Sequence, residues 1–372
     1  MFCNNYSFKI NNINFHFFEF IKLLIRKSTK KDFFYVDLWC EKFSNITAMK
    51  KTSFLLIFIS IIMFASAYDN EGIIVDATSG ATLSPSTKNK KDDKNSNDII
   101  AEGAKVEKLA DGFRFTEGPA VDKKGNVYFT DQPNNRILIW SVKDEKLSVF
   151  HENGGRANGM YFDKKGNLLS CSDMDNEIWK IDMKGNHIVL VSDFEGKKLN
   201  GPNDLWVHPN GGIYFTDPLY KRDYWTRDPE MQQDGEHVYY LSPDYKKLIR
   251  VDIDLEKPNG IIGSPDGKLL YVADIKASKT YVYDIQSDAT LSNKKLFASM
   301  GSDGMTMDSD GNIYITGRGV TVFNPKGEKI AHIPVEAGWT ANVCFGGKDM
   351  KTLFITASEF LYCIKMNVKG IR

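Results

Sequence analysis

Six short segments between residues 117 and 342 place a carboxylate or amide side chain next to small or apolar residues. The segments are Glu117-Gly-Pro, Asn158-Gly-Met, Asn203-Asp-Leu, Asn259-Gly-Ile, Asp303-Gly-Met and Asn342-Val-Cys. Brought together, these side chains would offer oxygen ligands with few charges and no imidazole or thiolate. Such a set suits Ca²⁺ best, with Mg²⁺, Mn²⁺ or Zn²⁺ as alternatives. The simpler interpretation is that each Asn or Asp only shapes the turn before a glycine.

The chain between residues 104 and 366 repeats a glycine-containing turn followed by a short β-rich strand. The six units end at Asp131, Asp173, Asp217, Asp274, Gly317 and Ala357, which gives spacings of 42, 44, 57, 43 and 40 residues. Such a period, with several short strands per unit, is typical of β-propeller blades and disfavours a β-sandwich. We therefore predict an all-β, six-bladed β-propeller over residues 104–366. The last unit has only three strands, so an N-terminal strand at residues 104–110 is expected to complete the last blade and remove an open edge.

The predicted propeller places all six polar segments at the same end of its central channel. Each segment opens the innermost strand of its unit, where a polar side chain is either solvated or bound to a ligand. The symmetry of the fold would then direct two carboxylates and four amides to one point. The long third spacing adds a loop at this end, with Leu219, Tyr220, Tyr224 and Trp225 among charged residues. This loop is either a substrate lid or a solvated insertion, and Trp339 is placed to form the opposite wall.

The amino-terminal part of the chain has the features of an export signal. Met49-Lys50-Lys51 precedes an apolar run from Phe54 to Phe64, which closes with Ala65-Ser66-Ala67. A basic start, an apolar segment of about 7–15 residues and an A-x-A site are typical of a secretory signal peptide. A bilayer span needs about 20 apolar residues. We predict a mis-assigned upstream extension at residues 1–48, a signal peptide at 49–67, and an exported protein that is periplasmic or secreted. The alternative is a genuine extension with an internal membrane anchor.

A polar linker is predicted at residues 68–103 and a short C-terminal tail at residues 367–372. The linker is too poor in apolar residues to order itself. It contains Asp76-Ala-Thr-Ser-Gly-Ala-Thr-Leu-Ser84, which resembles the short sequence on which exported electron-transport proteins carry flavin mononucleotide. By that resemblance Thr82 would be the attachment point. The alternative is a chance match within a linker of small residues.

Charge and cysteine usage exclude several classes of protein. The chain has 48 basic and 48 acidic residues, and this balance argues against nucleic acid as the main partner. The cysteines show neither a CxxC pair nor a zinc-finger spacing. Three of them, Cys171, Cys344 and Cys363, follow the signal peptide, and we predict free buried thiols. No G-x-S-x-G motif occurs, so no serine nucleophile is expected.

The polar segments belong to longer motifs that resemble a known family. These include Gly155-Arg-Ala-Asn-Gly159, Leu199-Asn-Gly-Pro-Asn-Asp204, Phe215-Thr-Asp-Pro218, Pro258-Asn-Gly260 and Cys344-Phe-Gly-Gly347. In this order they resemble the gluconolactonase, regucalcin and luciferin-regenerating-enzyme family, over residues 104 to about 366. The resemblance implies a six-bladed propeller with one divalent cation at the channel mouth, bound by Glu117, Asn203, Asn259 and Asp303. It also implies that Asp303 is the catalytic acid/base and that Arg156, Asn158 and Asn203 contact the substrate.

The activity implied by this resemblance is lactone hydrolysis. The carbonyl oxygen of a lactone gains negative charge in the transition state, and a cation held by neutral amide oxygens polarises it. Asp303, with Glu117 as second choice, would act as base toward water. We therefore expect an exported, divalent-cation-dependent lactonase acting on an aldonolactone such as glucono-1,5-lactone, with no nucleic-acid partner and no membrane partner after signal cleavage. Two alternatives stay open: a metal-dependent phosphotriesterase or aryl-esterase, and a non-catalytic propeller that binds a sugar or a protein. Both a monomer and a dimer are compatible with the sequence.

Overall fold

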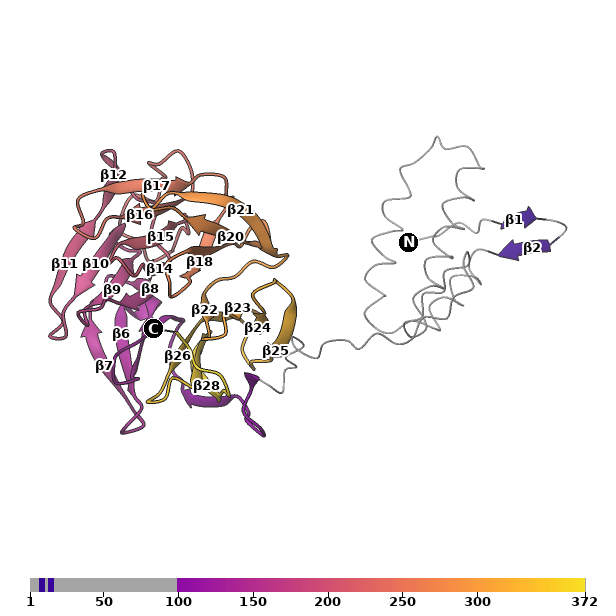
Figure 1. Ribbon diagram of the computed structural model, residues 1–372, viewed down its shortest axis with the longest axis horizontal. Coiled ribbons are helices and arrows are strands. Elements are labelled where there is room, and N and C mark those ends of the chain that lie inside the picture. Colours follow the sequence, from indigo (N-terminus) through magenta and orange to yellow (C-terminus); the bar gives the residue numbers. More distant parts are fainter. Residues whose placement is uncertain (1–6, 11–12, 17–98, 372) are drawn as a thin grey trace, which may run out of the picture. The chain divides into compact units, whose positions relative to one another are not determined.

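Most of the described chain forms six antiparallel sheets of four strands each (Figure 1). The computed structural model describes residues 7–10, 13–16 and 99–371. The chain divides into two compact units, residues 1–88 and 89–372. In the first unit, β1 (Ser7–Ile10) pairs antiparallel with β2 (Ile13–His16). The predicted signal peptide, most of the linker and Thr82 lie outside the described residues.

The first three blades of the second unit follow one another along the chain. Blade one contains β4 (Thr116–Val121), β5 (Val127–Asp131), β6 (Arg136–Ser141) and β7 (Lys146–Glu152), with a 3-10 turn η1 at Gln132–Asn134. Blade two contains β8 (Ala157–Phe162), β9 (Leu168–Ser172), β10 (Glu177–Ile181) and β11 (His187–Val191). A small hairpin of β12 (Asp193–Phe194) and β13 (Lys197–Lys198) precedes blade three, which contains β14 (Leu205–Val207), β15 (Ile213–Asp217), β16 (His237–Leu241) and β17 (Leu248–Asp252).

The remaining three blades close the ring. Blade four contains β18 (Pro258–Gly263), β19 (Leu269–Asp274), β20 (Lys279–Ile285) and β21 (Leu291–Ala298). Blade five contains β22 (Met305–Met307), β23 (Ile313–Gly317), β24 (Gly319–Phe323) and β25 (Lys329–Ile333). Blade six contains β26 (Thr340–Gly346), β27 (Thr352–Ala357), β28 (Phe360–Lys365) and β3 (Glu107–Ala110).

The strand β3 joins the two ends of the propeller chain. It pairs antiparallel with β28, with Ala110 opposite Leu361 and Glu107 opposite Cys363. The first strands of neighbouring blades contact one another in a closed circle, from β4 through β8, β14, β18, β22 and β26 back to β4. The prediction of a six-bladed propeller closed by an N-terminal strand is therefore confirmed.

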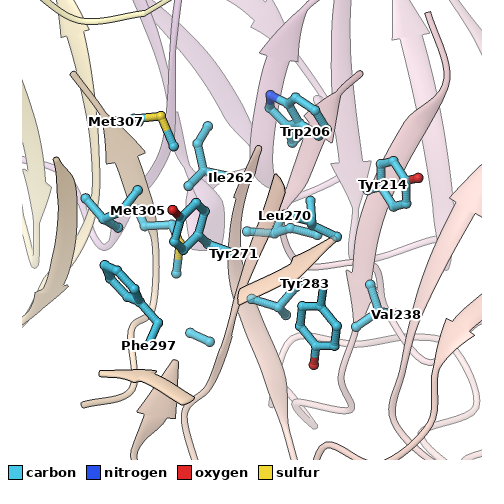
Figure 2. Packing of buried hydrophobic residues seen from close by; sticks show 14 of the residues in the cluster. Trp206, Tyr214, Val238, Ile262, Leu270, Tyr271, Tyr283, Phe297, Met305 and Met307 are labelled. Atoms are coloured by element: carbon cyan, nitrogen blue, oxygen red, sulfur yellow. The ribbon is translucent and has the colours of Figure 1, made fainter. Parts of the chain in front are cut away.

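Large apolar side chains fill the space between adjacent blades. One cluster joins blades three, four and five through Trp206, Tyr214, Tyr271, Phe297 and Met305, all of which are buried (Figure 2). The rings of Tyr271 and Phe297 meet edge to face, with centroids 4.9 Å apart. Because alternate residues of a strand point to opposite faces, each blade packs against both of its neighbours. This packing fixes the inner strands whose ends carry the polar segments.

Residues just outside the predicted propeller boundaries also take part in the fold. Ile99 is fully buried, and its carbonyl accepts a hydrogen bond from the Asn367 N–H at 2.9 Å. Val368, in the predicted tail, is buried in the same cluster. These contacts place Ile99 and the beginning of the tail against blade six.

The cysteines of the propeller are free and buried, as predicted. Burial raises the pKa of the Cys363 thiol to about 11, which keeps it protonated near neutral pH. In the described part of the chain, no helix is long and apolar enough to cross a membrane.

Candidate functional site

The six polar segments meet at one end of the channel. Glu117 lies in β4, Asn158 in β8, Asn259 in β18 and Asn342 in β26, while Asn203 and Asp303 lie just before β14 and β22. All are buried except Asp303, which keeps partial exposure. Because the inner strands form a closed circle, the six segments approach one region from six blades.

Glycines beside these residues allow the inner strands to come close together. A Cβ atom on Gly304 would lie 1.9 Å from Cγ of Asn342 on the next blade. A Cβ atom on Gly118 would lie 1.9 Å from the carbonyl oxygen of Asn158. Neither position accepts a side chain without moving a site residue of the neighbouring blade. Gly118 and Gly304 therefore have a structural reason beyond turn formation.

Irregular strand pairing accompanies the polar residues of several blades. The register of β4 against β5 shifts between Glu117 and Ala120, and that of β18 against β19 shifts between Pro258 and Ile261. Such β-bulges re-aim a side chain and are common beside active sites. They allow a polar residue of a buried strand to turn away from the apolar core.

Asp303 is held by hydrogen bonds from both neighbouring blades. The Trp339 Nε1–H donates to Oδ2 of Asp303 at 2.6 Å, and Nδ2 of Asn259 donates to Oδ1 at 3.0 Å. Nδ2 of Asn259 also donates to the hydroxyl of Tyr220 at 2.9 Å. These bonds fix the orientation of the Asp303 carboxylate. Trp339 therefore borders the candidate site through Asp303.

Asn342 connects two further carboxylates. Its Nδ2 lies 3.3 Å from Oε2 of Glu117 and 3.4 Å from Oδ2 of Asp204. Glu117 also accepts a hydrogen bond from the Gly118 N–H at 2.6 Å. Asp204 was not among the predicted site residues, although it directly follows Asn203. Blades one, three and five thus each contribute a carboxylate.

Burial and mutual repulsion disfavour the charged forms of these carboxylates. Burial raises the pKa of Glu117 well above its usual range, and the charges of Asp303 and Asp204 raise it further. Burial raises the pKa of Asp204 to about 7. It also raises the pKa of Asp303, against the hydrogen bonds from Trp339 and Asn259 and the charge of Arg222. Buried carboxylates that raise one another's pKa favour the binding of a cation.

Two buried amide oxygens at the channel mouth have no hydrogen-bond partner, namely Oδ1 of Asn158 and Oδ1 of Asn259. An unpaired buried acceptor costs free energy, and carboxylate and amide oxygens are ligands that suit Ca²⁺. No three His, Cys, Asp or Glu side chains of the described chain lie close enough together to hold a metal ion. Any cation here would therefore depend on amide ligands as well as on Glu117 and Asp303.

Arg156 lies under the loop at residues 218–236, with its guanidinium already engaged. Its Nη1 donates to the carbonyl of Pro133 at 2.5 Å, and the guanidinium lies 4.2 Å from the centre of the Tyr224 ring. Its backbone φ of +49° is in the left-handed region, and Oδ1 of Asn135 accepts the Arg156 N–H at 2.7 Å. Arg156 thus supports the loop. The substrate contacts expected of Arg156, Asn158 and Asn203 stay predictions.

The loop at residues 218–236, which joins β15 to β16, is fastened on two sides. Asp173 of blade two accepts a hydrogen bond from Nε1 of Trp225 at 3.0 Å. Lys257 of blade four donates to the Leu219 carbonyl at 2.9 Å and to Oε1 of Glu236 at 3.0 Å. Together with the bond between Tyr220 and Asn259, these contacts hold the loop against the channel mouth.

A separate cavity of about 690 Å³ lies at the other end of the channel. It is lined by the far ends of the inner strands and by aromatic side chains, including Tyr128, Tyr161, Trp206 and Phe345. None of the six predicted polar residues lines it. We assign the candidate site to the opposite end, where several polar groups and raised pKa values coincide.

Comparison with known proteins agrees with this assignment. The chain matches the family model described as SMP-30/Gluconolactonase/LRE-like region over residues 115–359. It is 29% identical to a gluconolactonase from Zymomonas mobilis over 302 residues, which covers 73% of this chain and 84% of that protein. It is 28% identical to the diisopropyl-fluorophosphatase of Loligo vulgaris over 284 residues, which covers 68% and 88%. The solved structure of a gluconolactonase from Xanthomonas campestris has a TM-score of 0.67 at 30% identity, covering 72% of this chain and 91% of that one.

Fold and site together define a propeller hydrolase of the gluconolactonase type. The chain belongs to the SMP-30/gluconolactonase/LRE-like family. The matched region contains all six polar segments and the loop over them. The family resemblance seen in the sequence is therefore confirmed.

Proposed function

We propose that the protein is a divalent-cation-dependent lactonase that hydrolyses an aldonolactone such as glucono-1,5-lactone to the aldonic acid. The observation that carries the proposal is the arrangement around Asn259. Its Nδ2 holds Asp303, while its buried Oδ1 has no partner and is free to act as a ligand. The similarity to gluconolactonases over most of the chain supports the choice of a lactone as substrate.

Glu117, Asn203, Asn259 and Asp303 are the residues that would hold the cation. When bound, a divalent cation supplies a Lewis acid that polarises the lactone carbonyl oxygen. Ca²⁺ is the first choice, because the available ligands are carboxylate and amide oxygens. Asn158 lies on blade two, and its unpaired Oδ1 would accept a hydrogen bond from a substrate hydroxyl.

Asp303 is the proposed acid/base. Its carboxylate accepts a proton from the water whose oxygen attacks the lactone carbonyl carbon. The ring C–O bond then breaks, and Asp303 returns the proton to the leaving ring oxygen, which becomes a hydroxyl of the aldonic acid. The bonds from Trp339 and Asn259 hold both carboxylate oxygens during this exchange.

Substitution of Asp303 with Asn tests this role. Proton release from glucono-1,5-lactone is followed with a pH indicator, in protein treated with EDTA and then supplied with Ca²⁺, Mg²⁺, Mn²⁺ or Zn²⁺. We expect D303N to lower kcat by about 10²–10⁴-fold. The control is Asp308→Asn. Asp308 is also buried in blade five, and it accepts hydrogen bonds from Asn312 and Tyr314 away from the site. Full activity of D303N, or of the wild-type protein after chelation, would contradict the proposal.

Export is a further part of the proposal. Its support is the sequence of residues 49–67, with a basic start, an apolar run and an Ala-Ser-Ala end. Expression of the full chain in a bacterial host, followed by fractionation and amino-terminal sequencing, tests it. A mature protein that begins at Tyr68 in the periplasm or medium is expected. Uncleaved protein in the cytoplasm would exclude export in that host.

A second candidate function is hydrolysis of an organophosphorus compound at a P–O or P–F bond. It is supported by the similarity to diisopropyl-fluorophosphatase, which is comparable in identity to the match with the Zymomonas gluconolactonase. Rates on glucono-1,5-lactone and on diisopropyl fluorophosphate, measured side by side, separate the two activities. A cation that raises the melting temperature while neither substrate is hydrolysed would indicate a binding protein instead.

A further inference from the structure

The charged groups of the loop at residues 218–236 are mostly paired with other protein groups. Lys221 forms an ion pair with Glu230 at 2.8 Å. Arg227 donates to the carbonyls of Asp173 and Asn200, and its Nη2 lies 3.8 Å from Oδ1 of Asp173. These pairs hold the loop, and the charged groups that form them are already occupied by protein partners.

Arg222 is the exception. Its Nε is shielded from solvent and has no hydrogen-bond partner. None of the ion pairs within 4.0 Å in the described chain includes Arg222. Its guanidinium carbon lies 5.1 Å from the centre of the Tyr220 ring, and its charge also acts on the buried carboxylate of Asp173. A buried guanidinium donor without a partner is costly in a folded protein.

The surroundings of Arg222 place its guanidinium beside the candidate site. Tyr220, under the guanidinium, accepts a hydrogen bond from Asn259. The charge of Arg222 also acts on Asp303, where it opposes the rise in pKa. The loop is fastened to blade two through Trp225 and to blade four through Leu219, so Arg222 lies between two anchored points. The loop on either side of Arg222 is therefore held by hydrogen bonds before any ligand arrives.

We propose that Arg222 binds an anionic group on the substrate, so that the enzyme prefers a lactone carrying a carboxylate or a phosphate over a neutral one. The planar guanidinium can give two parallel hydrogen bonds to either group. Partial exclusion of water strengthens such a contact relative to one at the surface. This inference rests on the proposed lactonase activity, and it names the substrate class of the same site.

The test compares kcat/KM for three lactones in wild-type protein and in Arg222→Met. The lactones are glucono-1,5-lactone, which is neutral, a glucarolactone, which carries a carboxylate, and 6-phosphoglucono-1,5-lactone, which carries a phosphate. A charge-assisted hydrogen bond corresponds to about 10- to 100-fold in kcat/KM. We expect the wild-type protein to prefer at least one anionic lactone by that factor and R222M to lose the preference. The anionic lactone whose preference is lost identifies the group that Arg222 recognises.

Lys221→Met is the matched control, since Lys221 is adjacent, cationic, exposed and already paired with Glu230. It should keep the wild-type ratio of anionic to neutral rates. Increasing salt should reduce the preference of the wild-type protein only modestly, because the contact is shielded from solvent. An unchanged ratio in R222M would overturn the proposal. So would an equal loss on all three lactones, which would mean that Arg222 acts only through Asp303.

A binding measurement separates failure of this inference from failure of the proposed function. If the wild-type protein hydrolyses none of the lactones, the lactonase proposal fails. The melting temperature with glucarate, 6-phosphogluconate or gluconate then still reports on Arg222. Stabilisation by glucarate or 6-phosphogluconate beyond that by gluconate, lost in R222M and kept in K221M, supports anion recognition. No such difference overturns it.

Discussion

Removal of the hydrogen bond from Trp339 to Asp303 tests whether this bond orients the proposed acid/base. Trp339→Phe keeps an aromatic ring at the border of the site and removes the donor that lies 2.6 Å from Oδ2 of Asp303. A hydrogen bond to a charged group contributes about 1.5–3 kcal/mol. If the reaction needs the carboxylate in this orientation, that energy corresponds to about a 10- to 100-fold loss of rate. We expect kcat/KM for glucono-1,5-lactone to fall by this factor in W339F.

Trp179 provides a matched control in blade two. Its Nε1 donates to Oε2 of Glu177 at the same distance, 2.6 Å, and its ring stacks on His187 at 3.8 Å. Trp179→Phe removes an equivalent hydrogen bond at a carboxylate that we assign no catalytic role. It should lose stability without losing kcat/KM.

Both variants are assayed by proton release with saturating cation, alongside their melting temperatures. The reasoning is refuted if W339F keeps the wild-type kcat/KM. It is also refuted if W339F and W179F lose activity equally, because the loss would then reflect general destabilisation.

Three other substitutions test the inner strands, a buried histidine and the loop. Gly118→Ala should lower the melting temperature by about 3–10 °C and abolish stabilisation by Ca²⁺, because its Cβ would lie 1.9 Å from the Asn158 carbonyl oxygen. Thermal unfolding with and without Ca²⁺ measures both effects. Unaltered stabilisation by Ca²⁺ would show that the strands can adjust. His237→Gln should reduce the loss of unfolding free energy between pH 7 and pH 5. Burial lowers the pKa of His237, so the unfolded chain binds more protons below about pH 6.5 and the wild-type protein is destabilised as the pH falls. Urea titrations at pH 5, 6, 7 and 8 measure the free energy of unfolding of both proteins. An identical pH dependence of this free energy in the wild-type protein and the variant would contradict the prediction. Asp173→Ala should increase the rate of amide hydrogen exchange across residues 218–236 by about tenfold or more, because it removes the hydrogen bond from Trp225. An unchanged exchange rate would mean that the anchor at Lys257 is sufficient to hold the loop.

The sequence predicts this fold well because each blade is local. Every strand of a blade except β3 and β28 pairs only with strands next to it in the chain, so one repeated turn-and-strand unit contains most of the pairing information. The closing pair of β3 with β28 joins distant residues, but it follows from counting three strands after Ala341. The contribution of Ile99 and Val368 to blade six is not visible in this way, because both residues lie outside the repeated turn-and-strand units.

The site is predicted less completely, because side-chain partners come from other blades. The sequence identifies Glu117 and Asp303 at strand entrances, and the structure places them within electrostatic reach of each other. The sequence does not decide whether the side chain of Asn203 or that of the adjacent Asp204 turns toward Asn342. For Arg156 the decisive contact is the carbonyl of Pro133, on a loop of the preceding blade.

Arg222 is another residue whose role cannot be predicted from the sequence. The sequence presents it as one charge among several in a long loop. Only the structure shows that Lys221 and Arg227 are paired while Nε of Arg222 has no partner. The informative property is thus a missing contact, and no pattern of residue types encodes it.

The electrostatics of the site link folding of the propeller to cation binding. Glu117, Asp204 and Asp303 come from three different blades and approach one another only when the ring closes. Their raised pKa values mean that ring closure without a cation leaves them either protonated or in mutual repulsion. A cation that binds the folded protein would relieve this cost and stabilise it by mass action. Protons compete for the same oxygens, so the stabilisation by Ca²⁺ should increase as the pH rises. The arrangement that disfavours the cation-free propeller would therefore be the source of the proposed affinity for a cation.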